Sequence, residues 1–503
     1  MAKCYRGHTH DILKALTRGD LNISNSIYWH DYETFGSDPR TDRACQFAGI
    51  RTDEELNIVD EPLVIYCRPA LDTVPNPEAC LITGITPQQA LAKGIPESEF
   101  SAKIIAEFSE PQTCVAGFNN LRFDDEITRH LLYRCFYDPY EREWKNGNSR
   151  WDIIDLLRMT YALRPEGINW PSKEDGSPSF KLEDFTRANH IEHEGAHDAL
   201  SDVHASIAAA RLIRDKQSRL YDYYYKHRNK NTVVPMLNLH DPQPLVHISA
   251  MYPGSNGCMA IVLPLLQDPG NSNGIIVYDL SKDPSVWLDE SIESIKERLF
   301  TASHELPDGI ERIALKTVHL NKCPALAPLT VLTDAVINRF HINLDLCKQH
   351  QELLLNRTEL QEKLNHVFKP DFKAEQDPDL MLYSGGFFDH HDKNLFTKIR
   401  GLSAESLANQ YFDFHDSRLP ELLFRYRCRN YPESLTAEEQ QRWQMFCKEK
   451  LLVANSNGIS LIEAAEKIIV EKQAVADQKQ KLLLQELSQY IGDLRLKLGA
   501  VAV

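Results

Sequence analysis

The sequence predicts a chain of three domains: an α/β domain, then a small β-rich domain, then a helical domain. The length of 503 residues corresponds to about three ordinary domains. Short β-prone runs mix with helical patterns in the first part, and β-prone runs separated by Pro, Gly and Asn fill the middle. Helical spacing of apolar residues dominates the last part.

The α/β domain is expected over residues 27–215, with β-prone runs at 27–33, 45–51, 63–68 and 114–118. Thr86-Pro87 reads as a helix start, with Thr as the N-cap and Pro at the first helical position. A helical stripe begins at Phe123, and another helix runs from about Ala199 to Arg214. Strands followed by strands mixed with helices indicate an α/β arrangement.

The later domains are expected over residues 216–368 and 369–503, after an N-terminal extension at 1–26. Runs at 245–251, 258–265, 274–280 and 313–319 predict a small barrel or sandwich. Thr436-x-x-Glu439 is a capping box. Residues 460–498 predict a pair of core helices rather than a partner-binding coil, because their heptads are irregular.

Composition places the chain among ordinary globular proteins, with 42% hydrophobic and 25% charged residues. No run reaches the roughly 18 apolar residues of a membrane span, and the N-terminus does not read as a secretory signal. The 11 cysteines are scattered without a C-x-x-C pair. This pattern argues against a disulfide framework or structural zinc and favours a reducing, cytoplasmic location.

The formal net charge of −16 argues, taken alone, against nucleic acid as a partner. The argument is weaker for an enzyme that gathers divalent cations in a carboxylate cluster. Such a protein needs only a local basic track, and total charge does not report its distribution.

Two carboxylates lie two residues apart in the first β-prone run, in the segment His30-Asp31-Tyr32-Glu33. Residues at this spacing in a strand project from the same face, so Asp31 and Glu33 point together. Adjacent carboxylates repel, and a divalent cation that prefers oxygen ligands, such as Mg²⁺ or Mn²⁺, removes that cost. The alternative is a solvated polar strand end.

A second acidic segment, Phe123-Asp124-Asp125-Glu126, follows a β-prone run and opens a helix. Asp124 lies beside the apolar stripe of that helix, so it can face the sheet. The alternative is structural, because Asp caps helices and acidic residues complement the helix dipole. We assign Asp125 to such a structural role.

The third segment contains His197, Asp198 and Asp202 at the start of a helix. Asp198 fits the N-cap position and is assigned to structure. Asp202 falls in the first or second turn, and the small residues Ala205 and Ala209 below it allow close approach to a sheet. His197, just before the helix, can reach an attacking water while Asp202 holds a metal ion.

The ordered set of Asp31 and Glu33, then Asp124, then His197 and Asp202 resembles the DEDD exonucleases of the subtype with a histidine base. Further segments, including HDYETFG, LITGITPQQA, NNLRFDDE, YALRPEGINWP and YRCRNYP, resemble the bacterial exonuclease I family. The resemblance implies an RNase H-like α/β exonuclease domain, an SH3-like β-barrel domain and an α-helical C-terminal domain. These domains would form a monomer with a groove for one DNA strand.

The resemblance also implies an activity: 3′-to-5′ removal of 5′-mononucleotides from single-stranded DNA, in DNA repair and recombination. Asp31, Glu33, Asp124 and Asp202 would hold two Mg²⁺ ions, with Mn²⁺ as a substitute. Glu33 and His197 would be the catalytic pair, with His197 as the base that takes the proton of the attacking water.

A groove for a single strand needs cations for the backbone and aromatic platforms for the bases. The resemblance implies DNA contacts at Arg129, Tyr140, Trp144, Arg158, Lys181, Lys230 and Asn273, each of which could instead be surface charge or core packing. Lys181 stands where relatives carry Arg. A lysine ammonium group, which acts as a point charge, therefore replaces a guanidinium group that can donate two parallel hydrogen bonds. The family also binds the acidic C-terminal tail of the single-stranded DNA-binding protein, and Arg164 and Tyr223 are expected to contribute to that site.

Alternative functions follow from the same residues. An RNA-directed exonuclease of DEDD type is one, because these residues contact the scissile phosphate and not the sugar. A catalytically inactive DNA-binding scaffold is another, although all the chemical residues are present. A proofreading subunit that works with a separate polymerase is a third, disfavoured by the two additional domains.

Overall fold

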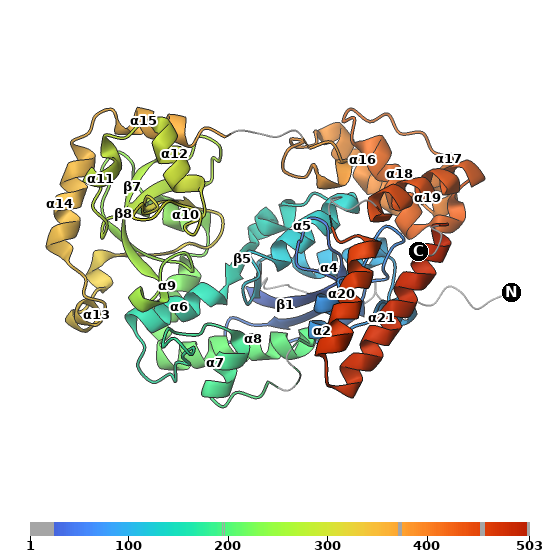
Figure 1. Ribbon diagram of the computed structural model, residues 1–503, viewed down its shortest axis with the longest axis horizontal. Coiled ribbons are helices and arrows are strands. Elements are labelled where there is room, and N and C mark those ends of the chain that lie inside the picture. Colours follow the sequence, from blue (N-terminus) through green and yellow to red (C-terminus); the bar gives the residue numbers. More distant parts are fainter. Residues whose placement is uncertain (1–24, 194, 196, 371–374, 453–457, 500–503) are drawn as a thin grey trace, which may run out of the picture.

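The computed structural model of the protein describes residues 25–193, 195, 197–370, 375–452 and 458–499. The predicted N-terminal extension therefore lies outside the described residues up to position 24. The α/β domain forms the centre of the molecule, with the β-rich domain on one side and the C-terminal helices on the other (Figure 1).

The α/β domain is built on a five-stranded sheet of order β3-β2-β1-β4-β5. Its strands are β1 (Ser26–Thr34), β2 (Ala44–Thr52), β3 (Leu63–Tyr66), β4 (Thr113–Gly117) and β5 (Ser149–Asp152). The central strand β1 pairs antiparallel with β2 and parallel with β4. The four predicted strands are confirmed, whereas β5 is too short and too polar, with Arg150 and Asp152, to stand out in the sequence.

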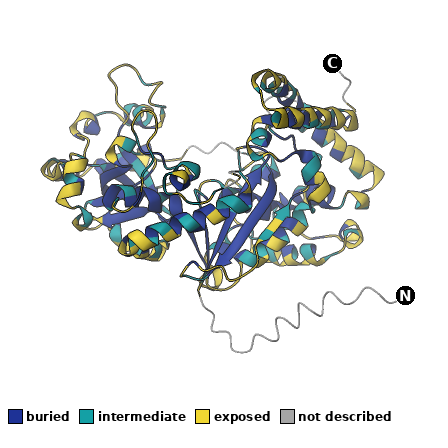
Figure 2. Ribbon diagram, turned by 90° about the horizontal axis from the view of Figure 1, so that it is seen from below, coloured by how far each residue is buried: buried dark blue, intermediate teal, exposed yellow. Residues whose placement is uncertain are grey.

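Helices cover both faces of this sheet and leave four of its strands largely buried, whereas the edge strand β3 is partly exposed (Figure 2). On one face Ile27 and Trp29 pack in a cluster with α6, α8 and α9, and on the other Tyr28 and Phe47 pack with α4 and α5. The cap predicted at Thr86 is confirmed, since its side chain accepts from the backbone N–H of Gln89. The helices are α2 (Pro77–Thr83), α3 (Pro87–Lys93), α4 (Glu97–Phe108), α5 (Asp124–Arg134), α6 (Ile153–Leu163), α7 (Leu182–Ala188), α8 (Ala199–Lys216) and α9 (Ser218–Lys226).

The middle domain contains an antiparallel five-stranded sheet of order β10-β6-β7-β8-β9. Its strands are β6 (Leu245–Ile248), β7 (Met259–Gln267), β8 (Gly274–Asp279), β9 (Leu315–His319) and β10 (Ala325–Pro328). Val262, Val277 and Leu326 belong to its apolar core. All of the β-prone runs predicted here contain a strand.

Helices of the middle domain were not predicted, because most are short elements between polar turns. They are α10 (Lys230–Val233), α11 (Ser285–Leu288), α12 (Ile292–Phe300), α13 (Asp334–Arg339), α14 (Leu344–Leu355) and α15 (Leu360–Val367). The predicted β-rich domain thus also contains helices between and after its strands.

The C-terminal domain is helical, as predicted. Its helices are α16 (His390–Gly401), α17 (Ala404–Asn409), α18 (Leu419–Asn430), α19 (Ala437–Leu452), α20 (Leu461–Ala474) and α21 (Gln478–Lys497). The capping box is confirmed, with the Glu439 N–H 3.2 Å from Thr436 Oγ1 and the Thr436 N–H 2.9 Å from the Glu439 carboxylate. The predicted core helix pair is also confirmed, because α20 and α21 pack against α2 and bury Leu461 and Leu484.

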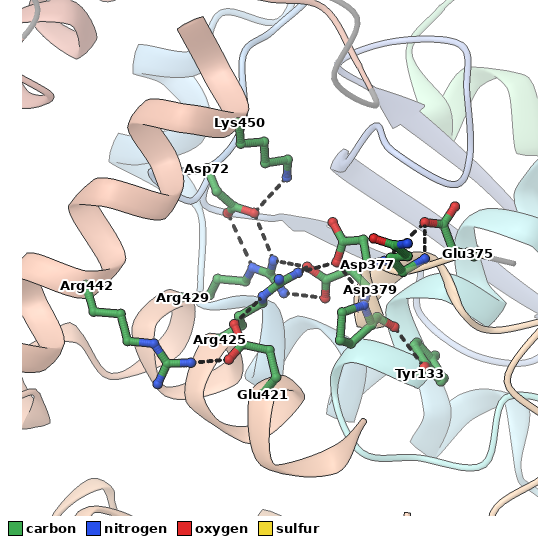
Figure 3. Close-up of polar contacts among 12 residues, drawn as sticks. Asp72, Tyr133, Glu375, Asp377, Asp379, Glu421, Arg425, Arg429, Arg442 and Lys450 are labelled. Atoms are coloured by element: carbon green, nitrogen blue, oxygen red, sulfur yellow. Dashed lines mark hydrogen bonds and ion pairs between the residues drawn. The ribbon is translucent and has the colours of Figure 1, made fainter. Parts of the chain in front are cut away.

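A buried network of ion pairs joins the C-terminal domain to the α/β domain (Figure 3). Asp72, from the loop before α2, lies 2.8 Å from Arg429 and 3.0 Å from Lys450. Arg429 also contacts Asp379 at 2.5 Å, and Arg425 contacts the same carboxylate at 2.9 Å. The side chains of Asp72 and Arg429 are 0% and 2% exposed, so this junction is fully enclosed.

A second junction lies at Glu126 on α5, which contacts residues of all three domains. Its carboxylate is 2.9 Å from Arg129 of the same helix and 3.4 Å from Lys322, which follows β9. The hydroxyl of Tyr383, from the C-terminal region, donates to the same side chain. These contacts hold the two outer domains against the central one.

None of the described helices is both long enough and apolar enough to cross a lipid bilayer.

Candidate active site

Strand β1 presents the first two acidic residues from the centre of the sheet. Asp31 pairs with Ala48 of β2 and Glu33 pairs with Gln46. Both carboxylates project from the face that carries Ile27 and Trp29, because residues two apart in a strand share a face. That face is the one covered by α8, so the strand directs both carboxylates toward that helix.

Helix α8 brings Asp202 to the same place. Asp202 lies in its first turn, and the buried small residues Ala205 and Ala209 let the helix pack closely on β1. One ligand atom each from Asp31, Glu33 and Asp202 lies within 4.8 Å of the others. The sequence prediction that these three residues meet is thus matched by the geometry.

Asp124 opens α5, directly after the loop that follows β4, and is 4% exposed. Its Oδ1 accepts a hydrogen bond of 3.2 Å from the backbone N–H of Tyr32, between Asp31 and Glu33 in the chain. This bond ties the start of α5 to β1. Asp124 also raises the pKa of Asp31 and Glu33, although it is not one of the three described acids whose ligand atoms lie within 4.8 Å of one another.

The carboxylate cluster is electrostatically unfavourable as it stands. Burial, followed by the charges of Asp202 and Asp124, raises the pKa of Glu33 to about 9. Burial and the neighbouring acids likewise hold the pKa of Asp31 well above its usual range. Within the described residues, no lysine or arginine forms an ion pair with Asp31, Glu33 or Asp124.

These observations fit a divalent metal site. Three carboxylates within ligand distance of one another supply the hard oxygen donors that Mg²⁺ and Mn²⁺ prefer. A bound cation would also compensate the repulsion that raises the pKa of Glu33, and ligand carboxylates must be ionised to bind it. Asp31, Glu33 and Asp202 are the residues that could hold an ion directly, with Asp124 beside them.

The predicted base His197 lies just before the N-cap of α8, with a backbone φ of +68° in the left-handed region. Its side chain is 43% exposed, and its Nε2 is 3.8 Å from a carboxylate oxygen of Glu183 on α7. It is close enough to Asp202 to lower the pKa of that carboxyl group, against the larger effect of burial. The imidazole therefore lies at the solvent side of the cluster.

The two acids assigned to structure are confirmed in that role. Asp198 caps α8, since its side chain accepts from the N–H of Ser201. Asp125 is buried between two guanidinium groups, 2.8 Å from Arg142 and 2.6 Å from Arg150. Its charge is compensated within the protein.

Two residues beside the cluster were missed by the sequence analysis. His193 contacts Asp202, with 2.6 Å between Nε2 and Oδ1. Asp152 caps α6 and accepts from the N–H groups of Asn119 and Leu121, which fixes the loop between β4 and α5. The spacing of His193 four residues before His197 was the available signal, but a lone histidine is usually structural.

The residues predicted to contact DNA differ in whether their side chains are exposed and free of ion pairs. Trp144 is 66% exposed, whereas Arg129 and Arg158 are buried and paired with acids. Arg129 lies over the ring of Tyr140, at 5.4 Å from its centroid. The two arginines are therefore not free surface cations, and Arg129 supports the aromatic ring instead.

Other predicted contacts are exposed or paired with each other. Lys181 is exposed at the N-cap of α7. Lys230 is exposed, and its Nζ donates to the Asn273 side-chain oxygen at 2.6 Å. Lys230 and Asn273, which are far apart in sequence, thus form one polar contact on the middle domain.

A large cavity of about 930 Å³ lies between the α/β domain and the middle domain. Its lining includes Arg122, Lys316 and Lys322, with Asp152 at the end nearest the loop before α5. Burial lowers the pKa of Lys316 to about 8. None of the predicted DNA contacts is among the described residues that line it, and its cations lie in a lining that also contains Asp155, Asp279 and Glu311.

The pair predicted to bind a partner lies together in a separate hollow of about 470 Å³. Arg164 Nη2 donates to the Val331 carbonyl at 3.1 Å, and the Tyr223 hydroxyl donates to the Leu326 carbonyl at 2.9 Å. Lys216 and Arg219 also line the hollow, beside the apolar residues Met159, Leu163, Leu220 and Val331. The site combines positive charge with apolar surface.

The fold and the site together define a metal-dependent exonuclease of the DEDD class: a mixed sheet whose central strand, with two flanking helices, gathers four carboxylates and a histidine. Three family models match the chain: "Exonuclease" over residues 28–210, "Exonuclease I SH3-like domain" over 228–370 and "Exonuclease I C-terminal domain" over 376–494. The chain belongs to the exonuclease I family and is a hydrolytic exodeoxyribonuclease.

Named relatives and solved structures agree with this assignment. Exodeoxyribonuclease I of Haemophilus influenzae is 44% identical over 92% of this chain and 98% of its own length. A moderately thermophilic exonuclease I from Methylocaldum szegediense is 49% identical, with a TM-score of 0.89 over 93% of this chain and 99% of that one. Exonuclease I of Escherichia coli in complex with a dA16 oligonucleotide is 42% identical, with a TM-score of 0.90 over 94% of this chain and 100% of that one.

Proposed function

We propose that this exodeoxyribonuclease removes 5′-mononucleotides from the 3′ end of single-stranded DNA with two Mg²⁺ ions, in DNA repair and recombination. Asp31, Glu33, Asp124 and Asp202 are the proposed metal residues. The observation that carries the proposal is the convergence of Asp31, Glu33 and Asp202 within 4.8 Å, without a lysine or arginine paired to them among the described residues. We further propose that the enzyme works as a monomer in the cytoplasm.

The chemistry divides between the ions and the chain. Bound divalent ions would supply positive charge for the attacking and leaving oxygens of the phosphodiester. The carboxylates fix where that charge lies, and His197 accepts a proton from the attacking water. The partly exposed position of His197 beside Asp202 supports this role, because a base must reach water that enters from solvent.

The substrate strand is proposed to pass from the cavity between the first two domains to the carboxylates. Lys316, Arg122 and Lys322 offer positive charge to the phosphates, and the exposed Trp144 offers a surface on which a base can stack. The complex of Escherichia coli exonuclease I with a dA16 oligonucleotide supports a single DNA strand as the substrate.

An RNA substrate is the alternative, because the proposed catalytic residues do not contact the sugar. An oligoribonuclease of Aromatoleum aromaticum is 26% identical over only 39% of this chain. The middle and C-terminal domains have no counterpart in that match, and they favour DNA.

A time course of digestion tests the function. The substrates are a 5′-labelled single-stranded DNA, its duplex and an RNA of the same sequence, each with Mg²⁺. We expect progressive shortening of single-stranded DNA from its 3′ end and none with Asp202→Asn. Preferred digestion of RNA would select the alternative, and equal digestion by Asp202→Asn would remove the carboxylates from the mechanism.

We also propose that the hollow containing Arg164 and Tyr223 binds the acidic C-terminal tail of single-stranded DNA-binding protein. Its cations and apolar lining suit a peptide that ends in acidic and apolar groups. A solved structure described as SSB/Exonuclease I, which is 41% identical to this chain, supports the partner. Arg164→Ala should reduce stimulation by the partner and leave digestion of a naked oligonucleotide unchanged, and Arg357→Ala, in the middle domain, is the control.

A further inference from the structure

His193 and His197 lie four residues apart in the loop between α7 and α8, and they differ in their surroundings. The side chain of His197 is 43% exposed, whereas that of His193 is 5% exposed. A base that takes a proton from water needs access to solvent, and His193 lacks it. Its burial beside the carboxylate cluster calls for a different role.

Hydrogen bonds hold the imidazole of His193 at both ring nitrogens. Nε2 lies 2.6 Å from Oδ1 of Asp202, and Nδ1 lies 3.2 Å from Oγ1 of Thr186. Thr186 is buried in α7, where its hydroxyl proton is donated to the backbone carbonyl of Glu183 and its oxygen faces Nδ1 of His193. His193 therefore forms a buried link from α7 to the carboxylate that α8 contributes to the site.

Asp202 needs such a link more than the other acids do. Asp31 and Glu33 extend from the central strand, where both pair with residues of β2, whereas Asp202 comes from the first turn of a helix and is 18% exposed. Repulsion from its acidic neighbours favours rotation of this carboxylate toward solvent. A donor on one of its oxygens opposes that rotation and leaves the second oxygen available to an ion.

The same link constrains the loop that carries His197. Among the described residues of this loop, which exclude 194 and 196, three have left-handed backbone angles: His190 at 56°, Gly195 at 87° and His197 at 68°. Such angles are uncommon outside glycine and persist only when the surroundings hold them. The side chain of His193 is 5% exposed and contacts Thr186 of α7 and Asp202 of α8, so it ties the loop to both helices.

We infer that His193 is a positioning residue of the active site: it donates to Asp202, orients that carboxylate for the metal ion and fixes the loop that presents His197. The inference rests on the proposed function, because it assigns to His193 a part in that same metal site. Residues that orient metal ligands in this way typically contribute about 10–100-fold to metal affinity or activity.

The experiment compares three variants of the full chain. His193→Leu removes the donor, His193→Gln keeps an N–H donor at a similar reach, and His204→Leu changes an exposed histidine on α8 as the control. Calorimetric titration with Mn²⁺ measures metal affinity without substrate. Single-turnover digestion and the KM for a DNA oligomer then separate chemistry from DNA binding.

We expect His193→Leu to weaken Mn²⁺ binding and the single-turnover rate by about 10–100-fold, with KM for DNA little changed. His193→Gln should recover most of both losses, and His204→Leu should behave as wild type. Mn²⁺ affinity of His193→Leu within twofold of wild type would overturn the inference. The inference would also be overturned if His193→Gln were as thermally stable as wild type but lost as much Mn²⁺ affinity and single-turnover rate as His193→Leu. If wild type bound Mn²⁺ but digested no DNA, the proposed function would fail while the affinities still decided the role of His193.

Discussion

Two groups of buried acids in this molecule have opposite electrostatics. In the carboxylate cluster, burial and the neighbouring acids raise the pKa of Glu33 to about 9. In the network at the domain junction, burial alone would raise the pKa of Asp72, but Arg429, Lys450 and Arg43 outweigh it and hold the pKa well below the usual range. The junction contains the arginine and lysine side chains that balance its acids, whereas the carboxylate cluster needs a bound cation to balance its negative charge.

This difference indicates that the residues of the junction serve stability and those of the carboxylate cluster serve function. The junction satisfies its own charges and joins two domains, so its residues are expected to act on folding. The cluster retains unfavourable like charges at the centre of the sheet, a cost that a site for divalent ions explains. Substitutions in the two groups should therefore change stability and activity in opposite patterns.

The largest expected effect comes from Asp31→Asn. Removing one metal carboxylate should reduce the rate of DNA digestion by about a thousand-fold or more, since it weakens stabilisation of charge in the transition state. The metal-free variant should nevertheless melt a few degrees higher than wild type, because one of the repelling charges is gone. Scanning calorimetry and a digestion assay measure both, with Asp222→Asn on the surface of α9 as the control. A fall in both quantities would contradict the comparison.

The next effect is expected at the junction. Asp72→Asn leaves Arg429 and Lys450 without their shared partner, and breaking a buried ion pair in this way costs about 3–5 kcal/mol. Chemical denaturation should show this loss, while the single-turnover rate at low temperature stays close to that of wild type. The exposed acid Glu433 supplies the control Glu433→Gln. Unchanged stability would show that the junction does not hold the domains together.

The pH dependence of stability should have opposite signs in the two groups. The folded-state pKa of Glu33 is raised from 4.5 to about 9, so the folded metal-free protein binds more protons than the unfolded chain between these values. Stability then falls as pH rises through that window. For Asp72 the folded-state pKa is lowered, so its contribution is present above the unfolded pKa and is lost in acid.

Melting temperatures across pH in the presence of a chelator measure these slopes. Glu33→Gln should flatten the decline on the alkaline side, and Asp72→Asn should flatten the decline on the acid side. Added Mg²⁺ should stabilise wild type more at the alkaline end, where the ligands lose their protons more readily. Equal Mg²⁺ stabilisation of wild type and Glu33→Gln at every pH would argue against Glu33 as a ligand.

The smallest effect is expected at the exposed ring of Trp144. Trp144→Ala should weaken binding of a DNA oligomer by about 1 kcal/mol, the lower end for a base stacked on an aromatic ring. Trp144→Phe keeps a stacking surface and should recover part of that loss. Fluorescence anisotropy with a labelled oligomer in Ca²⁺ measures both variants. A KM and affinity equal to wild type for Trp144→Ala would remove this residue from the DNA path.

The sequence predicts the direction of each acidic side chain from its own element, whereas the meeting of the three segments is implied by the resemblance to the DEDD exonucleases. The two-residue spacing of Asp31 and Glu33 in a strand fixes a common face, and the small residues after Asp202 indicate a helix that packs closely on a sheet. Asp124 follows a strand and opens a helix, which also places it near the sheet edge. In each case one secondary-structure element decides where the side chain points.

Contacts between segments that are distant in the sequence cannot be predicted from a single secondary-structure element. Nothing near Asp72 in the sequence indicates that Arg429 and Lys450 meet it, because that contact depends on how the domains dock. The burial of Arg129 and Arg158 and the cations in the cavity lining around Lys316 have the same origin. His193 was missed because its bond to Asp202 depends on a loop with left-handed residues, which no periodic pattern predicts.

The most direct test of the central claim is a count of the Mn²⁺ ions bound per chain by electron paramagnetic resonance, without DNA, in wild type and Asp31→Asn. The account predicts up to about two ions for wild type and a loss of tight binding in the variant, although the variant stays folded. Equal binding by the two proteins, or none by wild type, would contradict the claim that the carboxylates around Asp31 form the metal site.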